Sequence, residues 1–185
     1  QTEKISMAEY NKLYDVPIQL EGYDPTYKGH QGQIKKAATL IKNAKRPLII
    51  AGAGVLKSGA MAELKALAEK AQIPVANTLV GLGGFPGNHE LALGMVGMHG
   101  TVAANNCTED ADLVIAAGIR FHDRITGHPD FFCKKAKIIH IDIDPAEIDK
   151  NVTINVPIVG DLKRVLTELN TFVEPTTHES WIAQI

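Results

Sequence analysis

Two arginines and a carboxylate occur in a short polar segment that follows an apolar run. The segment from Gly118 to Arg124 comes after residues 112–117, which are apolar apart from Asp112, and it carries Arg120, Asp123 and Arg124. Guanidinium groups form paired hydrogen bonds with phosphate oxygens, so the segment is a candidate phosphate site. The alternative is a solvated charge cluster in which Asp123 pairs with Arg124, and the sequence leaves both interpretations open.

A second candidate segment, which is acidic, follows the largely apolar residues 137–141. His140, Asp142 and Asp144 alternate along the chain, which places them on one side of an extended strand. Metal ligation is one interpretation of this pattern. A carboxylate at the end of a strand more often holds a ribose hydroxyl or caps a helix, and Pro145 is typical of a helix start. The pattern therefore favours hydroxyl binding or capping over a metal site.

Glycines mark a third candidate segment, 52–54, directly after the apolar run 47–51. The dinucleotide fingerprint G-x-G-x-x-G requires a further glycine at position 57, where the chain has Lys57. An acidic residue for an adenosine ribose is also missing, because the next apolar run ends in Asn77. The turn is either a phosphate-binding loop or a tight connection between a strand and a helix.

Two further residues invite a catalytic interpretation, His99 within a glycine-rich segment and Ser58 as its nucleophile. No G-x-S-x-G, H-E-x-x-H or triad-like pattern surrounds them. We expect His99 to pack against, or to hydrogen-bond to, whatever the glycine-rich segment encloses. We assign no catalytic residue and no metal ligand in this chain.

These candidate residues require a fold that brings the ends of several strands together. Continuous apolar runs predict buried strands at 47–51, 73–77, 112–117, 137–141 and 156–159. Helical periodicity predicts helices over 31–45, from Ser58 onwards, over 101–108, and after Asp161, which caps the last one. This alternation predicts an α/β fold with an open, doubly wound, Rossmann-like parallel sheet of five to six strands and helices on both faces. Ligands bind such sheets at the carboxyl ends of the strands.

The regions between and beyond these elements set the domain limits. Residues 79–100 contain seven glycines and one proline in 22 positions, too many for a helix interior, and they are too apolar for a solvated linker. Residues 1–29 have no sustained period and are expected to be an inter-domain linker. We expect a single domain over 30–171 and an exit linker over 172–185, which holds the lone Trp181.

Composition narrows the class of protein. The 185 residues are 45% hydrophobic, with 19 basic and 21 acidic residues and a formal net charge of -2, which argues against nucleic-acid binding. No apolar stretch approaches the roughly 18 residues that span a bilayer, and the first 20 residues lack the pattern of a signal peptide. Cys107 and Cys133 show no metal-binding spacing. We expect reduced thiols in a cytoplasmic protein with no membrane partner.

Five segments, taken in order, resemble the central domain of the acetohydroxyacid (acetolactate) synthase catalytic subunit, a thiamine-diphosphate enzyme. They are RPLIIAGAG, NTLVGLGGFPGNHELALGMVGMHG, DADLVIAAGIRFHDRITG, KIIHIDIDPAEIDKN and IVGDL, and the similarity runs from about Lys45 to Leu169. The resemblance implies an enzyme that joins pyruvate to pyruvate or 2-oxobutyrate, with loss of CO2, in branched-chain amino-acid biosynthesis. It also implies a central domain that binds FAD in a structural role and two flanking domains that bind thiamine diphosphate and Mg²⁺. The implied partners are further catalytic subunits in a homo-oligomer and a small regulatory subunit.

The resemblance also implies which residues contact the flavin. They are Gly52, Ala53, Gly54, Thr78, Leu79, Met98, His99, Gly118, Arg120, Arg124, Asp142, Ile143 and Asp161. The chain departs from the family pattern at His122, where an acidic residue is expected, and it lacks the G-D-G and N-N motif for diphosphate and Mg²⁺. We therefore expect no carboligase activity from this chain alone. The alternatives are the middle domain of a pyruvate oxidase or decarboxylase, and a stand-alone NAD-type nucleotide-binding domain.

Overall fold

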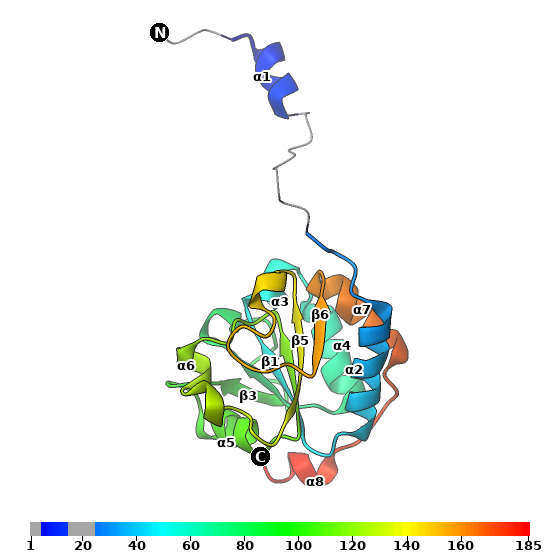
Figure 1. The fold of residues 1–185 in the computed structure, drawn as a ribbon, viewed down its shortest axis with the longest axis vertical. Helices are drawn as coiled ribbons and strands as arrows, with labels where there is room; N and C mark the ends of the chain where they lie inside the picture. The colour runs from blue at the N-terminus through cyan, green and yellow to red at the C-terminus, as the bar shows by residue number, and fades with distance from the viewer. Residues whose placement is uncertain (1–4, 15–24) are drawn as a thin grey trace.

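The computed structural model describes residues 5–14 and 25–185. It contains a sheet of six parallel strands in the order β3-β2-β1-β4-β5-β6 (Figure 1). The strands are β1 (Pro47–Ala51), β2 (Val75–Asn77), β3 (Ala92–Met95), β4 (Leu113–Ala117), β5 (Lys137–Asp142) and β6 (Val156–Val159). The predicted doubly wound α/β fold is confirmed. The chain leaves β1 in one direction toward β2 and β3 and returns to the other side through β4, so the topological switch point lies between β1 and β4.

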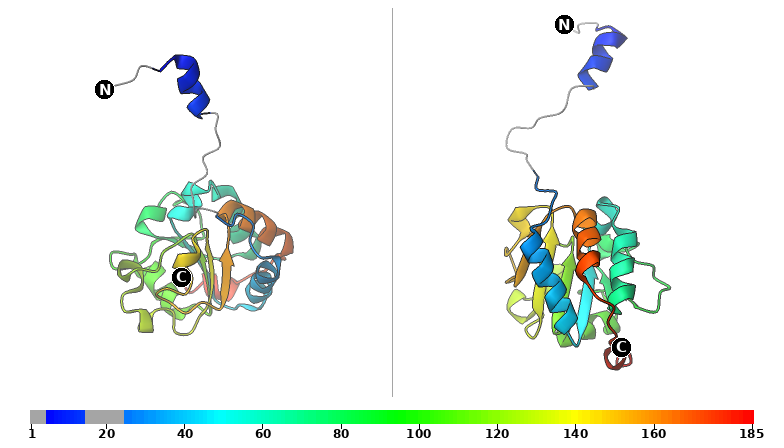
Figure 2. Two further views of the ribbon diagram at one scale, coloured as in Figure 1. Left: turned by 45° about the horizontal axis from the view of Figure 1, so that its top comes forward. Right: turned by 90° about the vertical axis from the view of Figure 1, so that its right-hand side faces the viewer.

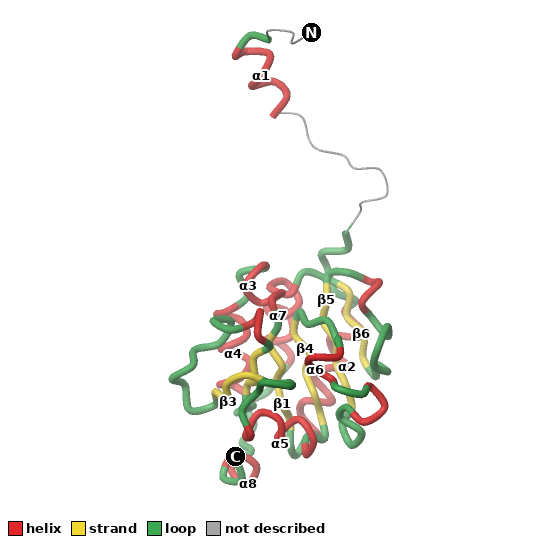
Figure 3. Tube along the Cα trace, turned by 90° about the vertical axis from the view of Figure 1, so that its left-hand side faces the viewer, coloured by secondary structure: helices red, strands yellow, loops and turns green. Residues whose placement is uncertain are grey.

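The strand residues alternate between two buried cores, one on each face of the sheet. Ile49 and Ala51 belong to the first core, whereas Leu48 and Ile50 belong to the second. All five residues of β1 are buried, which explains its continuous apolar sequence. Figure 3 shows the strands in yellow and the helices in red along the chain.

Helices cover both faces of the sheet. The first face is covered by α2 (Gln31–Asn43), α4 (Met61–Ala71) and α7 (Leu162–Phe172), which lie side by side in the right-hand view of Figure 2. The second face is covered by α5 (Val102–Asp110) and by the segment that follows β4. Thr101 caps α5 and Asp161 caps α7, because their side-chain oxygens accept from the Ala104 and Arg164 amides respectively. The predicted cap at Asp161 is confirmed.

The predicted start of the second helix, at about Ser58, is wrong. The structure has a short helix α3 (Ala53–Lys57), a turn, and then α4 from Met61. Ser58 closes α3, because its hydroxyl donates to the Gly54 carbonyl at 2.7 Å. Gly59 follows with a φ of +65°, a left-handed conformation that ends the helix and that glycine adopts without strain.

Strand β3 lies inside the glycine-rich segment 79–100, where no separate strand was located from the sequence. It is the edge strand beyond β2, and its register shifts between Val75 and Ala76. Gly94 within it has a φ of +83°, and all four β3 residues are only half-buried. The strand therefore lacks the apolar run that marks the buried strands.

Shorter helices connect the main elements. They are α6 (Asp123–Thr126) and the 3₁₀ turns η1 (Leu79–Gly81), η2 (Pro129–Phe131) and η3 (Pro145–Glu147). None of the helices in the described ranges is long and apolar enough to cross a membrane. Cys107 and Cys133 are both free and buried, and burial raises the pKa of Cys107 to about 11 and that of Cys133 to about 12.

The two terminal segments are partly helical. Within the predicted linker 1–29, residues 1–4 and 15–24 lie outside the described residues, and helix α1 (Met7–Tyr14) was not predicted. Ser6 and Glu9 form a capping box at its start, a signal that the sequence contains as S-x-x-E. At the other end, α8 (Glu179–Ile182) places Trp181 in the core, where its indole N–H donates to the Pro47 carbonyl at 3.0 Å. The role of 172–185 as an inter-domain connection stays a prediction.

Candidate nucleotide-binding site

A cavity of about 600 Å³ lies at the carboxyl ends of β1, β4, β5 and β6, at the switch point of the sheet. This is the position at which open parallel sheets bind nucleotides, and the volume falls within the usual range for ligand pockets. Its lining residues are Ala53, Gly54, Leu56, Lys57, Ser58, Thr78, Val80, Gly118, Ile119, Arg120, His122, Ile125, Asp142, Ile143, Asp144, Asp161 and Leu162.

The sequence-predicted contacts divide into two groups around this cavity. Ala53, Gly54, Thr78, Gly118, Arg120, Asp142, Ile143 and Asp161 line it. Gly52, Leu79, Met98, His99 and Arg124 do not. Leu79 and Met98 are 69% and 70% exposed, so they present apolar surface outside the cavity. Met98 and Arg124 are nevertheless linked, because the Met98 amide donates to the Arg124 carbonyl at 3.0 Å.

The turns after β1 and β4 touch through their backbones. The Gly54 amide donates to the Gly118 carbonyl at 3.0 Å, and a Cβ atom at Gly54 would lie 2.6 Å from the Gly118 Cα. A Cβ at Gly52 would lie 2.2 Å from the Gly118 oxygen. Gly118 itself has a φ of +60°. Close packing of two strand-end turns therefore accounts for these glycines, and the tight-connection interpretation of 52–54 explains the sequence there.

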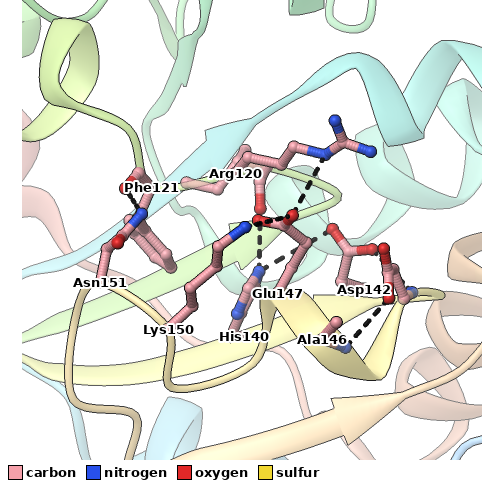
Figure 4. Close-up of polar contacts among 10 residues, drawn as sticks. Arg120, Phe121, His140, Asp142, Ala146, Glu147, Lys150 and Asn151 are labelled. Carbon is pink, nitrogen blue, oxygen red and sulfur yellow. Dashed lines mark hydrogen bonds and ion pairs between the residues drawn. The ribbon is translucent and has the colours of Figure 1, made fainter.

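Arg120 points into the site with little to hold its side chain. The side chain is 63% exposed, and its Nε lies 3.8 Å from Glu147 Oε1, which also accepts from Lys150 at 3.1 Å (Figure 4). The guanidinium donors are thus largely available to a ligand anion. Asp123 and Arg124 form the predicted internal ion pair at 3.4 Å, and both side chains are exposed.

The two acidic residues at the end of β5 accept hydrogen bonds from nearby backbone amides. Asp142 Oδ1 accepts from the Asp144 amide at 2.9 Å, and Asp144 caps the turn η3 by accepting from the Ala146 amide at 3.0 Å (Figure 4). Burial raises the pKa of Asp142, although the hydrogen bond from Asp144 N acts in the opposite direction. Asp144 thus takes the capping role, one of the two interpretations of this pattern, whereas Asp142 accepts the amide of the cap residue itself.

His140 lies beneath this group and is fully buried. Its Nε2 is 2.9 Å from the Ile119 carbonyl and 3.9 Å from Asp142 Oδ2, so His140 and Asp142 lie on the same side of β5 as predicted. Burial lowers the pKa of His140, which favours the neutral ring. A search of the described residues finds no group of three His, Cys, Asp or Glu side chains that could hold a metal ion.

Thr78 provides a hydroxyl that lacks a partner. It follows β2, lines the cavity and is only 2% exposed, and its Oγ1 has no hydrogen-bond partner within the described part of the chain. A buried hydroxyl without a partner costs free energy that a bound polar ligand would recover. The atom is therefore an independent indication of a ligand at this site.

Several residues that line the cavity were not predicted as ligand contacts from the sequence. They include Leu56, Lys57 and His122. Lys57 was noted only as a departure from the glycine fingerprint, yet α3 brings it to the cavity as a second cation. His122 precedes α6 as its N-cap residue and is exposed. The helix α3 starts directly at Ala53, at the carboxyl end of β1. A prediction that began the helix there, rather than at Ser58, would have placed Leu56 and Lys57 at the site.

A second cavity of about 460 Å³ lies beside β2 and β3, between α4 and the glycine-rich residues 82–87. Asn77 lines it with a buried Oδ1 that lacks a partner among the described residues. His99 lies outside both cavities.

Comparison with known proteins decides the family. A family model described as the central domain of thiamine pyrophosphate enzymes matches residues 34–169. This chain belongs to that family. The matched residues of this central domain run from α2 to α7 and include the whole sheet.

The relatives of this central domain agree with the resemblance seen in the sequence. It is 54% identical over 177 residues to the probable acetolactate synthase large subunit of Methanocaldococcus jannaschii, covering 93% of this chain and 30% of that protein. The probable large subunit of Methanococcus aeolicus is 59% identical over 152 residues, covering 82% and 25%. The acetolactate synthase large subunit of Corynebacterium glutamicum is 50% identical over 165 residues, covering 89% and 26%. The chain thus spans between 25% and 30% of the length of these relatives.

Proposed function

We propose that this central domain binds FAD in a structural role, as part of an acetolactate synthase large subunit. The parent enzyme would condense pyruvate with pyruvate or 2-oxobutyrate and release CO2, in branched-chain amino-acid biosynthesis. Flanking domains would supply thiamine diphosphate and Mg²⁺, and catalytic subunits would form a homo-oligomer that a small regulatory subunit can join. We place the enzyme in the cytoplasm.

The observation that carries the FAD proposal is the cavity at the switch point, with Arg120 at its edge and the unpartnered Thr78 hydroxyl in its wall. These residues fit a phosphorylated ligand. Arg120 and Lys57 supply positive charge for a diphosphate, and the buried hydroxyl supplies a further hydrogen bond. The relatives named acetolactate synthase support the choice of parent enzyme.

The remaining lining residues suit the sugar and ring parts of the ligand. Asp142 and Asp161 each accept a backbone amide with one carboxylate oxygen, so their other oxygens are available to accept from ribose or ribityl hydroxyls. Leu56 and Ile143 are 39% and 41% exposed at the cavity, and they offer apolar surface to a ring face. Bound FAD would supply no net redox chemistry to the carboligation.

The five predicted contacts outside the cavity remain part of the proposal. An extended dinucleotide that reaches beyond the cavity would pass over the exposed Leu79 and Met98. The hydrogen bond between Met98 N and the Arg124 carbonyl joins the glycine-rich segment to the arginine segment. Backbone contacts of this kind would keep the two segments together when the ligand binds.

The test uses the full-length enzyme. We expect the purified protein to release FAD on denaturation, identified by its absorbance and retention time, rather than NAD or ADP. Flavin-free enzyme should regain carboligase activity with FAD and equally with a flavin analogue that cannot be reduced. Release of NAD or ADP would overturn the proposal, and activity restored by FAD but not by the analogue would favour the oxidase-type alternative.

A further inference from the structure

The backbone around Arg120 is held by side chains from another part of the chain. Arg120 lies in the loop between β4 and α6, and among the described residues its guanidinium has one ion-pair partner, Glu147, at 3.8 Å. Within the loop, the His122 amide donates to the Arg120 carbonyl at 3.0 Å, which makes a local turn. A local turn of this kind does not fix the loop relative to the sheet.

His140 holds the carbonyl before Arg120. The imidazole Nε2 is 2.9 Å from the Ile119 oxygen, and because a carbonyl oxygen only accepts, Nε2 must carry the hydrogen. Nδ1 is buried and has no partner within the described residues, so the neutral ring with its proton on Nε2 leaves no buried donor unpaired. His140 is 0% exposed on β5, a strand paired with β4, so its position is set by the sheet.

Asn151 holds the carbonyl after Arg120. Its Nδ2 donates to the Phe121 oxygen at 2.7 Å, a contact that joins residues 30 positions apart. The Phe121 ring packs edge-on against His140, with 4.9 Å between ring centroids, and against Phe132, with 5.8 Å. Figure 4 shows Asn151 beside Phe121 and His140 nearer to Arg120, so the two side chains meet the loop at separate points.

We propose that His140 and Asn151 are positioning residues that clamp the two carbonyls flanking Arg120, and thereby direct its guanidinium toward the bound flavin nucleotide. The proposal rests on the proposed function, because it takes Arg120 as a contact to FAD. Neither side chain has a hydrogen bond to the guanidinium, so the clamp acts only through the backbone. The two hydrogen bonds fix the peptide units on either side of the Arg120–Phe121 peptide and leave the arginine side chain free to meet its ligand.

A purely structural role makes a different prediction. If His140 only fills the core, its replacement lowers thermal stability and changes FAD affinity by the same factor whether or not Arg120 is present. If it positions Arg120, its effect on affinity depends on the arginine. A double-mutant cycle separates the two.

The experiment measures FAD affinity of the full-length flavin-free enzyme by flavin fluorescence, together with the melting temperature of each variant. His140→Phe keeps a ring of similar shape but removes the donor, and we expect FAD binding to weaken about tenfold. In an Arg120→Ala background the same change should weaken binding by less than about twofold. His140→Gln retains an N–H donor and should bind FAD within about threefold of the wild type.

The outcomes separate this inference from the proposed function. Equal factors for His140→Phe with and without Arg120, or an unchanged affinity, would overturn the clamp while FAD binding itself stands. A wild-type enzyme that binds no FAD would overturn both, and that result is visible before any variant is made. If His140→Phe yields no folded enzyme, Asn151→Ala provides the same cycle from the other carbonyl, with the same expected loss of coupling to Arg120.

Discussion

The carboxyl edge of the sheet is built in two different ways. At the ends of β4, β5 and β6, which we call the clamped side, most of the loop contacts come from polar side chains, although Gly118 also packs against Gly54. At the ends of β1, β2 and β3, which we call the glycine side, loops pack because side chains are absent. The residues of the first kind are His140, Asp142, Asp144, Asn151 and Asp161, and those of the second kind are Gly52, Gly54, Gly81, Gly97 and Gly100.

The difference determines how each side tolerates change. On the glycine side a Cβ atom would lie 2.3 Å from the Ala51 oxygen at Gly81 and 2.4 Å from the Arg124 oxygen at Gly97. Main-chain atoms cannot move aside as a flexible side chain can. On the clamped side a lost side chain removes one hydrogen bond but leaves space. We therefore expect the glycine side to be the more sensitive in stability and the clamped side in ligand affinity.

The largest expected effect is that of Gly81→Ala. The new Cβ would collide with backbone atoms of Ala51 and Gly52, so we expect a loss of about 3 kcal/mol or more in the free energy of unfolding. Gly87→Ala is the matched control, because, apart from Gly87 and its two chain neighbours, no heavy atom of the described residues would lie within 4 Å of its Cβ. Urea denaturation of the chain should show the first variant unfolding far earlier and the second close to wild type. Equal midpoints would remove the distinction between the two sides.

A smaller effect, on affinity, is expected of Arg120→Ala. Loss of its charge-assisted hydrogen bonds should weaken FAD binding about ten- to a hundredfold in the full-length enzyme. Asp142→Asn should weaken it by about tenfold at most, because the amide oxygen can still accept from the Asp144 amide. Flavin titration gives both constants, and the melting temperature of Arg120→Ala should stay near that of wild type since the side chain is mostly exposed. A larger effect of Asp142→Asn would reverse the assigned roles.

Acid should weaken the clamped side through His140. Burial lowers the pKa of this histidine in the folded state, so the unfolded chain binds more protons as the pH falls below about 6.5. Stability is then present above that pH and lost below it. The nearby carboxylates of Asp142 and Glu147 oppose the shift, and His178 beside Asp112 shifts in the same direction as His140. Melting temperatures from about pH 8 to about pH 5 should fall less in His140→Gln than in wild type.

The smallest effect is expected of Arg124→Ala. Its ion pair with Asp123 is exposed on both partners, so the free energy of unfolding should change by less than about 0.5 kcal/mol. Because the side chain does not line the cavity, FAD affinity should fall less than it does in Arg120→Ala. Thermal denaturation and flavin titration check the two statements. A loss of affinity equal to that of Arg120→Ala would show that the ligand extends well past the cavity.

Much of the fold could be predicted from local sequence patterns. The buried strands have continuous apolar runs, and Asp161 carries the cap signal of α7. Strand β3 was not predicted, because its residues show neither a continuous apolar run nor a regular alternation of apolar and polar side chains. It is half-buried, contains Gly94 and pairs with β2 through a register shift. The break between α3 and α4 was not predicted, because the helical periodicity of α4 gives no signal of where the helix begins and the prediction included Gly59 in it.

The site could be predicted only in outline. Residues that follow strands were identified because parallel strands bring their carboxyl ends to one edge. The partners of those residues were not, since His140 reaches Ile119 across 21 positions and Asn151 reaches Phe121 across 30. Such pairings depend on the register of β4 and β5, in which Ala116 lies opposite His140. No spacing within either segment contains that information.

The contact between Trp181 and the Pro47 carbonyl has a consequence for how the chain folds during synthesis. The contact joins residues 134 positions apart and involves β1. One edge of β1 pairs with β4, a strand that is made more than sixty residues later. On the ribosome, the apolar β1 therefore emerges long before either partner does. Such long-range closure slows folding and prolongs the exposure of an aggregation-prone strand. Only when α8 has been made does the Pro47 carbonyl of β1 gain the Trp181 N–H as its donor.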